Sequence, residues 1–239
     1  MNLQGSRVVV VGGSSGMGLA SAKRFAAKGA KVTIASRDKD KLARAASEIG
    51  HGCEIAVLDM TVEFQVAEFF DKLDGLDHLM LIGAGTPAWG PIGQVTMEAL
   101  DSAFHTKLRG YFMCAKYGYP KIAKNGSILF TIGGAARAAI PGTAGLAAIN
   151  GGIAAMARTL AKELAPIRVN VISPGLVDTP AYAWMGEDQR RAFYQQMADA
   201  SPLGRIGTVD DIAEMVLAVT TNTFVTGAIY DVDGGGSLG

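Results

Sequence analysis

The sequence of 239 residues contains little cysteine and no closely spaced set of metal-binding side chains. Its two cysteines, Cys53 and Cys114, lie far apart and form no CxxC pair, which favours a reducing cytoplasmic setting. The three histidines, His51, His78 and His105, also lack metal-ligand spacing. We therefore predict no bound metal and no cysteine redox chemistry.

Net charge and long apolar runs are also lacking. The 22 basic and 22 acidic residues cancel, and no basic stripe or polybasic cluster points to nucleic acid or an anionic membrane. The N-terminus has no charged region followed by a helical apolar stretch, so no signal peptide is expected. Residues Ala138–Ala157 carry no charge, but they contain Pro141, four glycines and mostly alanine. This composition favours a close-packed helix, within the protein or at a subunit interface, over a membrane span.

Strand-like and helix-like segments alternate along the chain. The expected strands are Val8–Val11, Val32–Ala35, Glu54–Leu58, His78–Ile82, Ser127–Ile132, Arg168–Ile172 and Ala228–Val232. The expected helices are Met17–Lys28, Lys39–Ile49, Glu63–Leu73, Met97–Lys121, Gly142–Leu164 and Val209–Ala218. Strands without strict alternation, separated by helices, predict an α/β fold with a doubly wound parallel sheet in a single Rossmann domain spanning 1–239.

One connection is longer than this pattern requires. Residues 178–205 follow a strand and contain Tyr182, Trp184, Met185, Phe193 and Tyr194. A segment of this length and aromatic content predicts a lid over an apolar ligand, although ordinary packing of an insertion would give the same composition.

A glycine-rich turn lies between the first strand and the first helix. It comprises Gly12, Gly13, Ser14, Ser15, Gly16, Met17 and Gly18. Glycine lets the backbone approach a pyrophosphate closely, and the free N–H groups of the following helix attract negative charge. In this strand–turn–helix setting the turn predicts a dinucleotide site.

The end of the second strand indicates which dinucleotide is bound. Ser36 and Arg37 stand where an acidic residue would accept hydrogen bonds from both ribose hydroxyls and repel a 2′-phosphate. Arg37 can instead pair with that phosphate, so NADP(H) is favoured over NAD(H). A solvated surface arginine is the alternative interpretation.

With these motifs in place, the chain resembles the short-chain dehydrogenase/reductase family over nearly its whole length. The resemblance rests on the Gly12-x3-Gly16-x-Gly18 spacing and on the segments Arg168–Gly175, Thr179-Pro180 and Asp233–Gly235. It implies that Asp59 and Met60 flank the adenine and that Gly83, Ala84 and Gly85 line the adenosine side. It also implies that Pro174, Gly175, Val177 and Thr179 hold the nicotinamide end.

The proton-transfer residues of that family do not align with this chain. The family pattern has Ser, Tyr, a Lys four residues after the Tyr, and an Asn on the preceding long helix. Counting back from the segment Arg158–Leu164 places Leu146 at the tyrosine position and Asn150 at the lysine position. Gly133-Gly134 replaces the serine pair, and Lys107 replaces the asparagine. No tyrosine lies between Gly126 and Pro166, so an alignment slip does not restore it.

In the family pattern the first long helix supplies an asparagine and the second a lysine. In this chain the first supplies Lys107 and the second Asn150, so the two residue types have exchanged places. We predict that Lys107 enters the crevice, has its pKa lowered by partial burial, and supplies a proton or stabilises negative charge. Asn150 would bond to a ribose hydroxyl. The alternative is that Lys107 is a surface or interface lysine and that the exchange is accidental.

Two functions remain open at this point. One is an atypical NADP(H)-dependent oxidoreductase acting on a small apolar carbonyl, imine or enone-like substrate. The other is a non-catalytic NADP(H)-binding sensor or partner subunit. In both, small residues such as Gly151 and Gly152 on the second long helix predict a homodimer or homotetramer.

Overall fold

A parallel seven-stranded sheet forms the centre of the protein in the computed structural model, which describes residues 1–83 and 88–238. The strand order is β3-β2-β1-β4-β5-β6-β7, and every neighbouring pair is parallel. The strands are β1 (Arg7–Val11), β2 (Lys31–Ser36), β3 (Glu54–Val57), β4 (Leu76–Leu81), β5 (Ile122–Thr131), β6 (Arg168–Pro174) and β7 (Ile229–Val232). The predicted doubly wound α/β fold is therefore confirmed.

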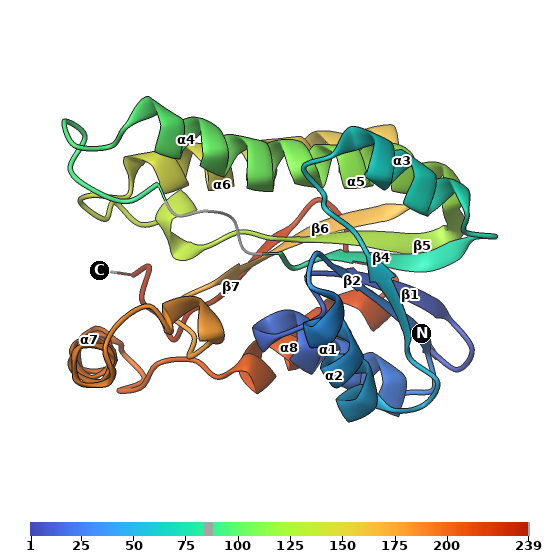
Figure 1. The fold of residues 1–239 in the computed structure, drawn as a ribbon, viewed down its shortest axis with the longest axis horizontal. Coiled ribbons are helices and arrows are strands. Elements are labelled where there is room, and N and C mark those ends of the chain that lie inside the picture. Colours follow the sequence, from blue (N-terminus) through green and yellow to red (C-terminus); the bar gives the residue numbers. More distant parts are fainter. Residues whose placement is uncertain (84–87, 239) are drawn as a thin grey trace.

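Helices cover both faces of this sheet (Figure 1). One layer contains α1 (Gly16–Ala27), α2 (Lys39–Ile49) and α8 (Val209–Thr221). The other contains α3 (Glu63–Asp71), α4 (Met97–Ala103), α5 (Gly110–Gly118) and α6 (Ala144–Glu163). No helix in the described part of the chain is both long and apolar enough to span a membrane.

Alternation along the buried strands divides the core into two clusters. In β1, Val8 and Val10 pack with Phe25 of α1 and Val216 of α8. Val9 and Val11 face the other helix layer. Successive side chains of a strand point to opposite faces, so a run of valines supplies both clusters. This is why the strands read as continuous apolar runs in the sequence.

The helix expected over Met97–Lys121 is not regular. Between α4 and α5 the residues Phe104–Arg109 form a π-helix, η1, and a short 3-10 turn, η2 (Tyr119–Lys121), ends the element. A π turn inserts one residue into the helical repeat and often marks a functional position, but apolar periodicity does not reveal it. Lys107 lies inside this turn, and Gly152 of α6 lies against Leu108 of the same turn.

The long connection 178–205 contains its own helix, which the sequence pattern did not identify. After a short 3-10 turn, η4 (Pro180–Tyr182), α7 (Glu187–Ala200) projects from the lower layer beyond the carboxyl end of the sheet (Figure 1). No residue of α7 is buried, and the ring of Phe193 packs on that of Tyr182 in η4.

Candidate active site

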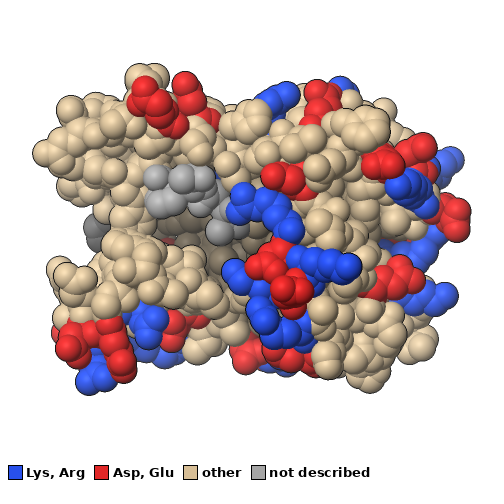
Figure 2. Space-filling model, viewed as in Figure 1, with Lys and Arg blue, Asp and Glu red and all other residues tan. Residues whose placement is uncertain are grey.

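A cavity of about 430 Å³ opens at the carboxyl ends of the central strands. It lies where the strand order reverses between β1 and β4, which is the position where doubly wound sheets bind ligands. Figure 2 shows the hollow between the two helix layers, with charged side chains gathered on its right and mostly uncharged residues on its left. The cavity therefore has a more polar end and a more apolar end.

The glycine-rich turn forms one wall of the cavity. Gly12 and Gly16 have φ values of +88° and +54°, in the region that favours glycine. A Cβ on Gly13 would come within 2.6 Å of Ile34, and a Cβ on Gly18 would overlap the carbonyl of Gly12. The wall also includes Ser14, Ser15 and Met17, at the start of α1. The turn is thus a tight cradle whose free amides face the cavity.

Ser36 and Arg37, at the end of β2, are among the residues that line the cavity. The Ser36 hydroxyl is buried and has no hydrogen-bond partner among the described residues. The neighbouring Asp38 is turned away, because its carboxylate accepts a hydrogen bond from the Lys41 N–H and caps α2. The Arg37 guanidinium is thus exposed at this end, whereas the Ser36 hydroxyl beside it is covered and unpaired.

Asp59, Met60 and Gly83 line the same end. Burial alone would raise the pKa of the Asp59 carboxyl, but hydrogen bonds from the backbone and hydroxyl of Thr61 outweigh burial and lower it. The carboxylate is held in place at 2.9 and 2.8 Å from these two donors. Two further predicted residues, Ala84 and Gly85, lie outside the described residues.

The other end of the cavity contains Lys107 and Asn150. The Lys107 Nζ donates a hydrogen bond of 3.0 Å to Oδ1 of Asn150, which is 4% exposed. The two residues are 43 positions apart in the sequence and come from η1 and α6. Burial lowers the pKa of the Lys107 ammonium to about 8. The amine therefore points into the cavity and not into bulk solvent.

The remaining residues at this end carry no acid or base. Leu146, Ile149 and Gly133 line the wall beside Asn150, with Thr106 and Thr131 as the hydroxyl groups. The Tyr111 phenol, a turn further along from Lys107, is fully buried and donates to the carbonyl of Gly83 at 2.9 Å. Burial raises the pKa of Tyr111, so its phenol stays protonated near neutral pH.

The segment after β6 reaches the cavity at Thr179. Thr179 lines the cavity, whereas Pro174, Gly175 and Val177 are not among its lining residues. The Val177 side chain packs in the core and its backbone bridges to Gly207, while Gly175 lies against Asp233. The role of these residues at the nicotinamide end stays a prediction.

The aromatic residues of the segment 178–205 gather beside the cavity. Pro180 and Ala181 line its wall, whereas the rings of Tyr182, Phe193 and Tyr194 pack on one another. Trp184, which is 68% exposed, lines a separate shallow hollow with Met185 and Phe193. Only the start of the segment therefore touches the cavity in this conformation.

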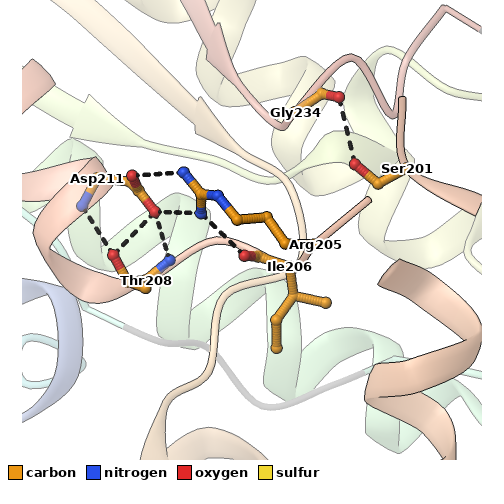
Figure 3. A network of polar contacts seen from close by, with 6 residues as sticks. All are labelled: Ser201, Arg205, Ile206, Thr208, Asp211 and Gly234. Carbon is orange, nitrogen blue, oxygen red and sulfur yellow. Dashed lines mark hydrogen bonds and ion pairs between the residues drawn. The ribbon is translucent and has the colours of Figure 1, made fainter. Parts of the chain in front are cut away.

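A polar network fastens the end of this segment to α8 (Figure 3). Arg205 donates to both oxygens of Asp211 at 2.7 and 2.9 Å, and the same carboxylate accepts from Thr208, the N-cap of α8. The guanidinium of Arg205 lowers the pKa of the Asp211 carboxyl. Ser201 donates to the carbonyl of Gly234 at 3.3 Å, so α7 is held at its C-terminal root.

This combination of a parallel sheet, a glycine cradle at the strand-order reversal and an exposed arginine after β2 is typical of a dinucleotide-binding protein. A model of the family described as enoyl-(acyl carrier protein) reductase matches residues 11–237. The short-chain dehydrogenase/reductase UcsE of an Acremonium species is 31% identical, covering 98% of this chain and 96% of the relative. The 3-oxoacyl-(acyl-carrier-protein) reductase FabG of Thermotoga maritima is 29% identical, covering 98% and 99%.

Solved structures agree with these relatives. A small-chain dehydrogenase crystallised in complex with NADPH is 38% identical with a TM-score of 0.87, covering 99% of this chain and 100% of the other. A short chain dehydrogenase/reductase family protein is 31% identical with a TM-score of 0.91, covering all of both chains. The chain belongs to the short-chain dehydrogenase/reductase family of NAD(P)-dependent oxidoreductases.

Proposed function

We propose that this protein is an NADP(H)-dependent oxidoreductase that reduces a small apolar carbonyl or conjugated carbonyl compound, with Lys107 in place of the family's tyrosine. The observation that carries this proposal is the hydrogen bond from Lys107 to Asn150 inside the cavity. This contact supports the interpretation that Lys107 and Asn150 have exchanged places between the two long helices. It argues against the alternative that Lys107 is a surface lysine.

The cofactor part of the proposal follows from the fit of the cavity wall. The cradle of Gly12, Gly16 and Gly18 would hold the pyrophosphate at the start of α1, and Arg37 with the unpaired Ser36 hydroxyl would hold the 2′-phosphate. The NADPH bound to the 38% identical relative supports this choice of cofactor. When bound, the cofactor would supply a hydride, and this chain's residues would orient the acceptor and handle the proton.

Lys107 would handle that proton. A donor with a pKa of about 8 is mostly protonated at pH 7 and can still release its proton readily. Asn150 would hold the amine by accepting one of its three hydrogen bonds, which leaves two donors for the oxygen of the substrate. Leu146, at the position of the family's tyrosine, contributes only apolar surface.

The test is NADPH oxidation by the whole protein against a panel of carbonyls, conjugated carbonyls, imines and quinones. We expect turnover on at least one conjugated carbonyl, and we expect Lys107→Met to lower it by about a hundredfold or more while NADPH binding is unchanged. Lys162→Met, an exposed position on α6, is the matched control and should keep full activity.

Two results would contradict this proposal. A fully active Lys107→Met variant would remove Lys107 from the chemistry. Tight NADPH binding without turnover on any member of the panel would favour a non-catalytic sensor or partner subunit.

We also propose a homodimer or homotetramer assembled through α5 and α6. Phe112 is 53% exposed on α5, and Gly151 on α6 has no neighbour within 4 Å of the position its Cβ would take. A second subunit would cover this surface. Light scattering at micromolar concentration should give a dimer or tetramer, and Phe112→Glu should lower the mass; a monomeric wild type would contradict the assembly.

A further inference from the structure

Lys107 is a cation without a counter-ion. Its amine donates to a neutral amide and forms no ion pair within the described residues, and the four residues Ala84–Pro87 include no acid. The charged residues lining the cavity are Arg37, Asp59 and Lys107, and the first two lie together at the opposite end. The Asp59 carboxylate, moreover, is already held by Thr61.

Lys107 is partly buried at the cavity wall, so its ammonium group has lost part of its hydration. Proteins seldom bury an ammonium group unless a carboxylate or another anion accompanies it, because the group loses most of its hydration. Burial is also the only cause of the lowered Lys107 pKa, with no opposing carboxylate to raise it. Among the described residues, the Lys107 amine thus has a neutral amide and no anion as its partner, and its remaining donors lie at the cavity wall.

We infer that the missing partner is the ligand, and that Lys107 and Asn150 form a binding site for a single ionised oxygen, an enolate or a phenolate, on an otherwise apolar molecule. The inference rests on the proposed function only in placing the ligand beside these two residues. The rest of the site supports an apolar body, since Ile132, Leu146 and Ile149 surround the pair.

The same charge decides between two kinds of substrate that the sequence leaves open. A conjugated carbonyl gains negative charge on its oxygen as it is reduced, and an ammonium group stabilises that charge. An iminium ion is already positive, and a second cation a few ångströms away in a partly dehydrated cavity repels it. The site thus favours oxygen acceptors that become anionic and disfavours iminium ions.

Binding of substituted phenols to the protein saturated with NADP⁺ tests this inference without any turnover. A set of fluorinated phenols has nearly constant size but increasing acidity. We expect affinity at pH 7 to rise with acidity by about ten- to hundredfold across the set, as for a charge-assisted hydrogen bond. The absorbance of the bound phenol should be that of the phenolate, even for members that are neutral in solution. A primary ammonium of the same size should bind much more weakly.

Two variants separate charge from shape. Lys107→Met should abolish the dependence on acidity and leave the bound phenol neutral. Asn150→Asp keeps the shape of the side chain but places a carboxylate 3.0 Å from the amine. Because this carboxylate neutralises the ammonium group, the variant should lose the phenolate preference as completely as Lys107→Met does. Both variants should admit the ammonium ligand better than the wild type does.

Three outcomes would overturn the inference. Equal affinity for phenols of all acidities in the wild type is the first, and a dependence that persists in Lys107→Met is the second. The third is an NADP⁺ affinity that falls in Lys107→Met as far as phenol affinity does, because Lys107 would then be a counter-ion of the cofactor. A protein that binds phenolates as expected but turns over no substrate would refute only the proposed function.

Discussion

The two ends of the cavity are built in different ways. The adenosine end uses residues that are close in the sequence, from Gly12 to Arg37, on the first strand, helix and strand of the fold. The opposite end brings together Lys107 of η1 and Asn150 of α6, which are 43 positions apart in the sequence. The first end is a backbone cradle that tolerates little change, whereas the second is a set of side chains that can be exchanged on a constant frame. Cofactor binding and chemistry should therefore respond separately to substitution.

The largest effect is expected in the backbone cradle. Gly18→Ala places a Cβ against the carbonyl of Gly12, so either α1 or the turn must move. We expect NADPH affinity to fall by on the order of a hundredfold or more, measured by calorimetry, and turnover to fall with it. Gly93→Ala, with no atom within 4 Å of the added Cβ, is the control. Unchanged NADPH affinity in Gly18→Ala would mean that the cradle does not contact the cofactor.

The second prediction concerns the choice of cofactor within the same end. Arg37→Asp should reverse much of a ten- to hundredfold preference for NADPH over NADH, because a carboxylate repels the 2′-phosphate and accepts from the ribose hydroxyls. Arg44→Asp makes the same charge change on the exposed side of α2, outside the cavity lining, and should leave the preference intact. Equal affinity of the wild type for both cofactors, measured at fixed salt, would refute this role of Arg37.

The third prediction uses pH to separate the two ends. The protonated form of Lys107 is the proposed donor, so kcat/KM should be constant below about pH 8 and fall by up to tenfold per pH unit above it. NADPH affinity should show no such step at that pH, because the charged residues that line the adenosine end, Arg37 and Asp59, are a guanidinium and a carboxylate. A profile that stays flat to pH 10 would argue against proton transfer by Lys107.

The smallest effect is expected at the segment 178–205. Trp184 lines a hollow separate from the cavity, so it contacts a cavity ligand only when the segment closes as a lid. With that closure, Trp184→Ala should weaken an apolar ligand about fivefold, through loss of apolar contact, and leave NADPH affinity unchanged. Phe224→Ala removes another exposed ring, far along the chain between α8 and β7, and should change neither. If NADPH affinity falls as much as ligand affinity, the segment supports the fold and does not act as a lid.

Sequence reasoning succeeded where a feature depends on neighbouring residues. The alternation of strands and helices, the glycine turn and the Ser36-Arg37 pair were all predicted, and the structure places the last two at one cavity. The interruption of the predicted helix 97–121 by η1 was missed, because a π turn leaves no apolar pattern. The helix α7 was missed as well, since none of its residues is buried and its periodicity is weak.

The sequence by itself determined the fold, the cofactor cradle and the family, because backbone sterics and apolar periodicity act over a few residues. Only the tertiary structure decided that Lys107 and Asn150 meet. Lys107 lies in the π turn, and Leu108 of the same turn packs against Gly152 of α6, the helix that carries Asn150. Nor could the sequence show that the amine lacks an acidic partner, because that depends on every side chain the fold brings within reach of it. Long-range packing sets the distances between these side chains. Only the tertiary structure therefore shows which charged groups meet at this site.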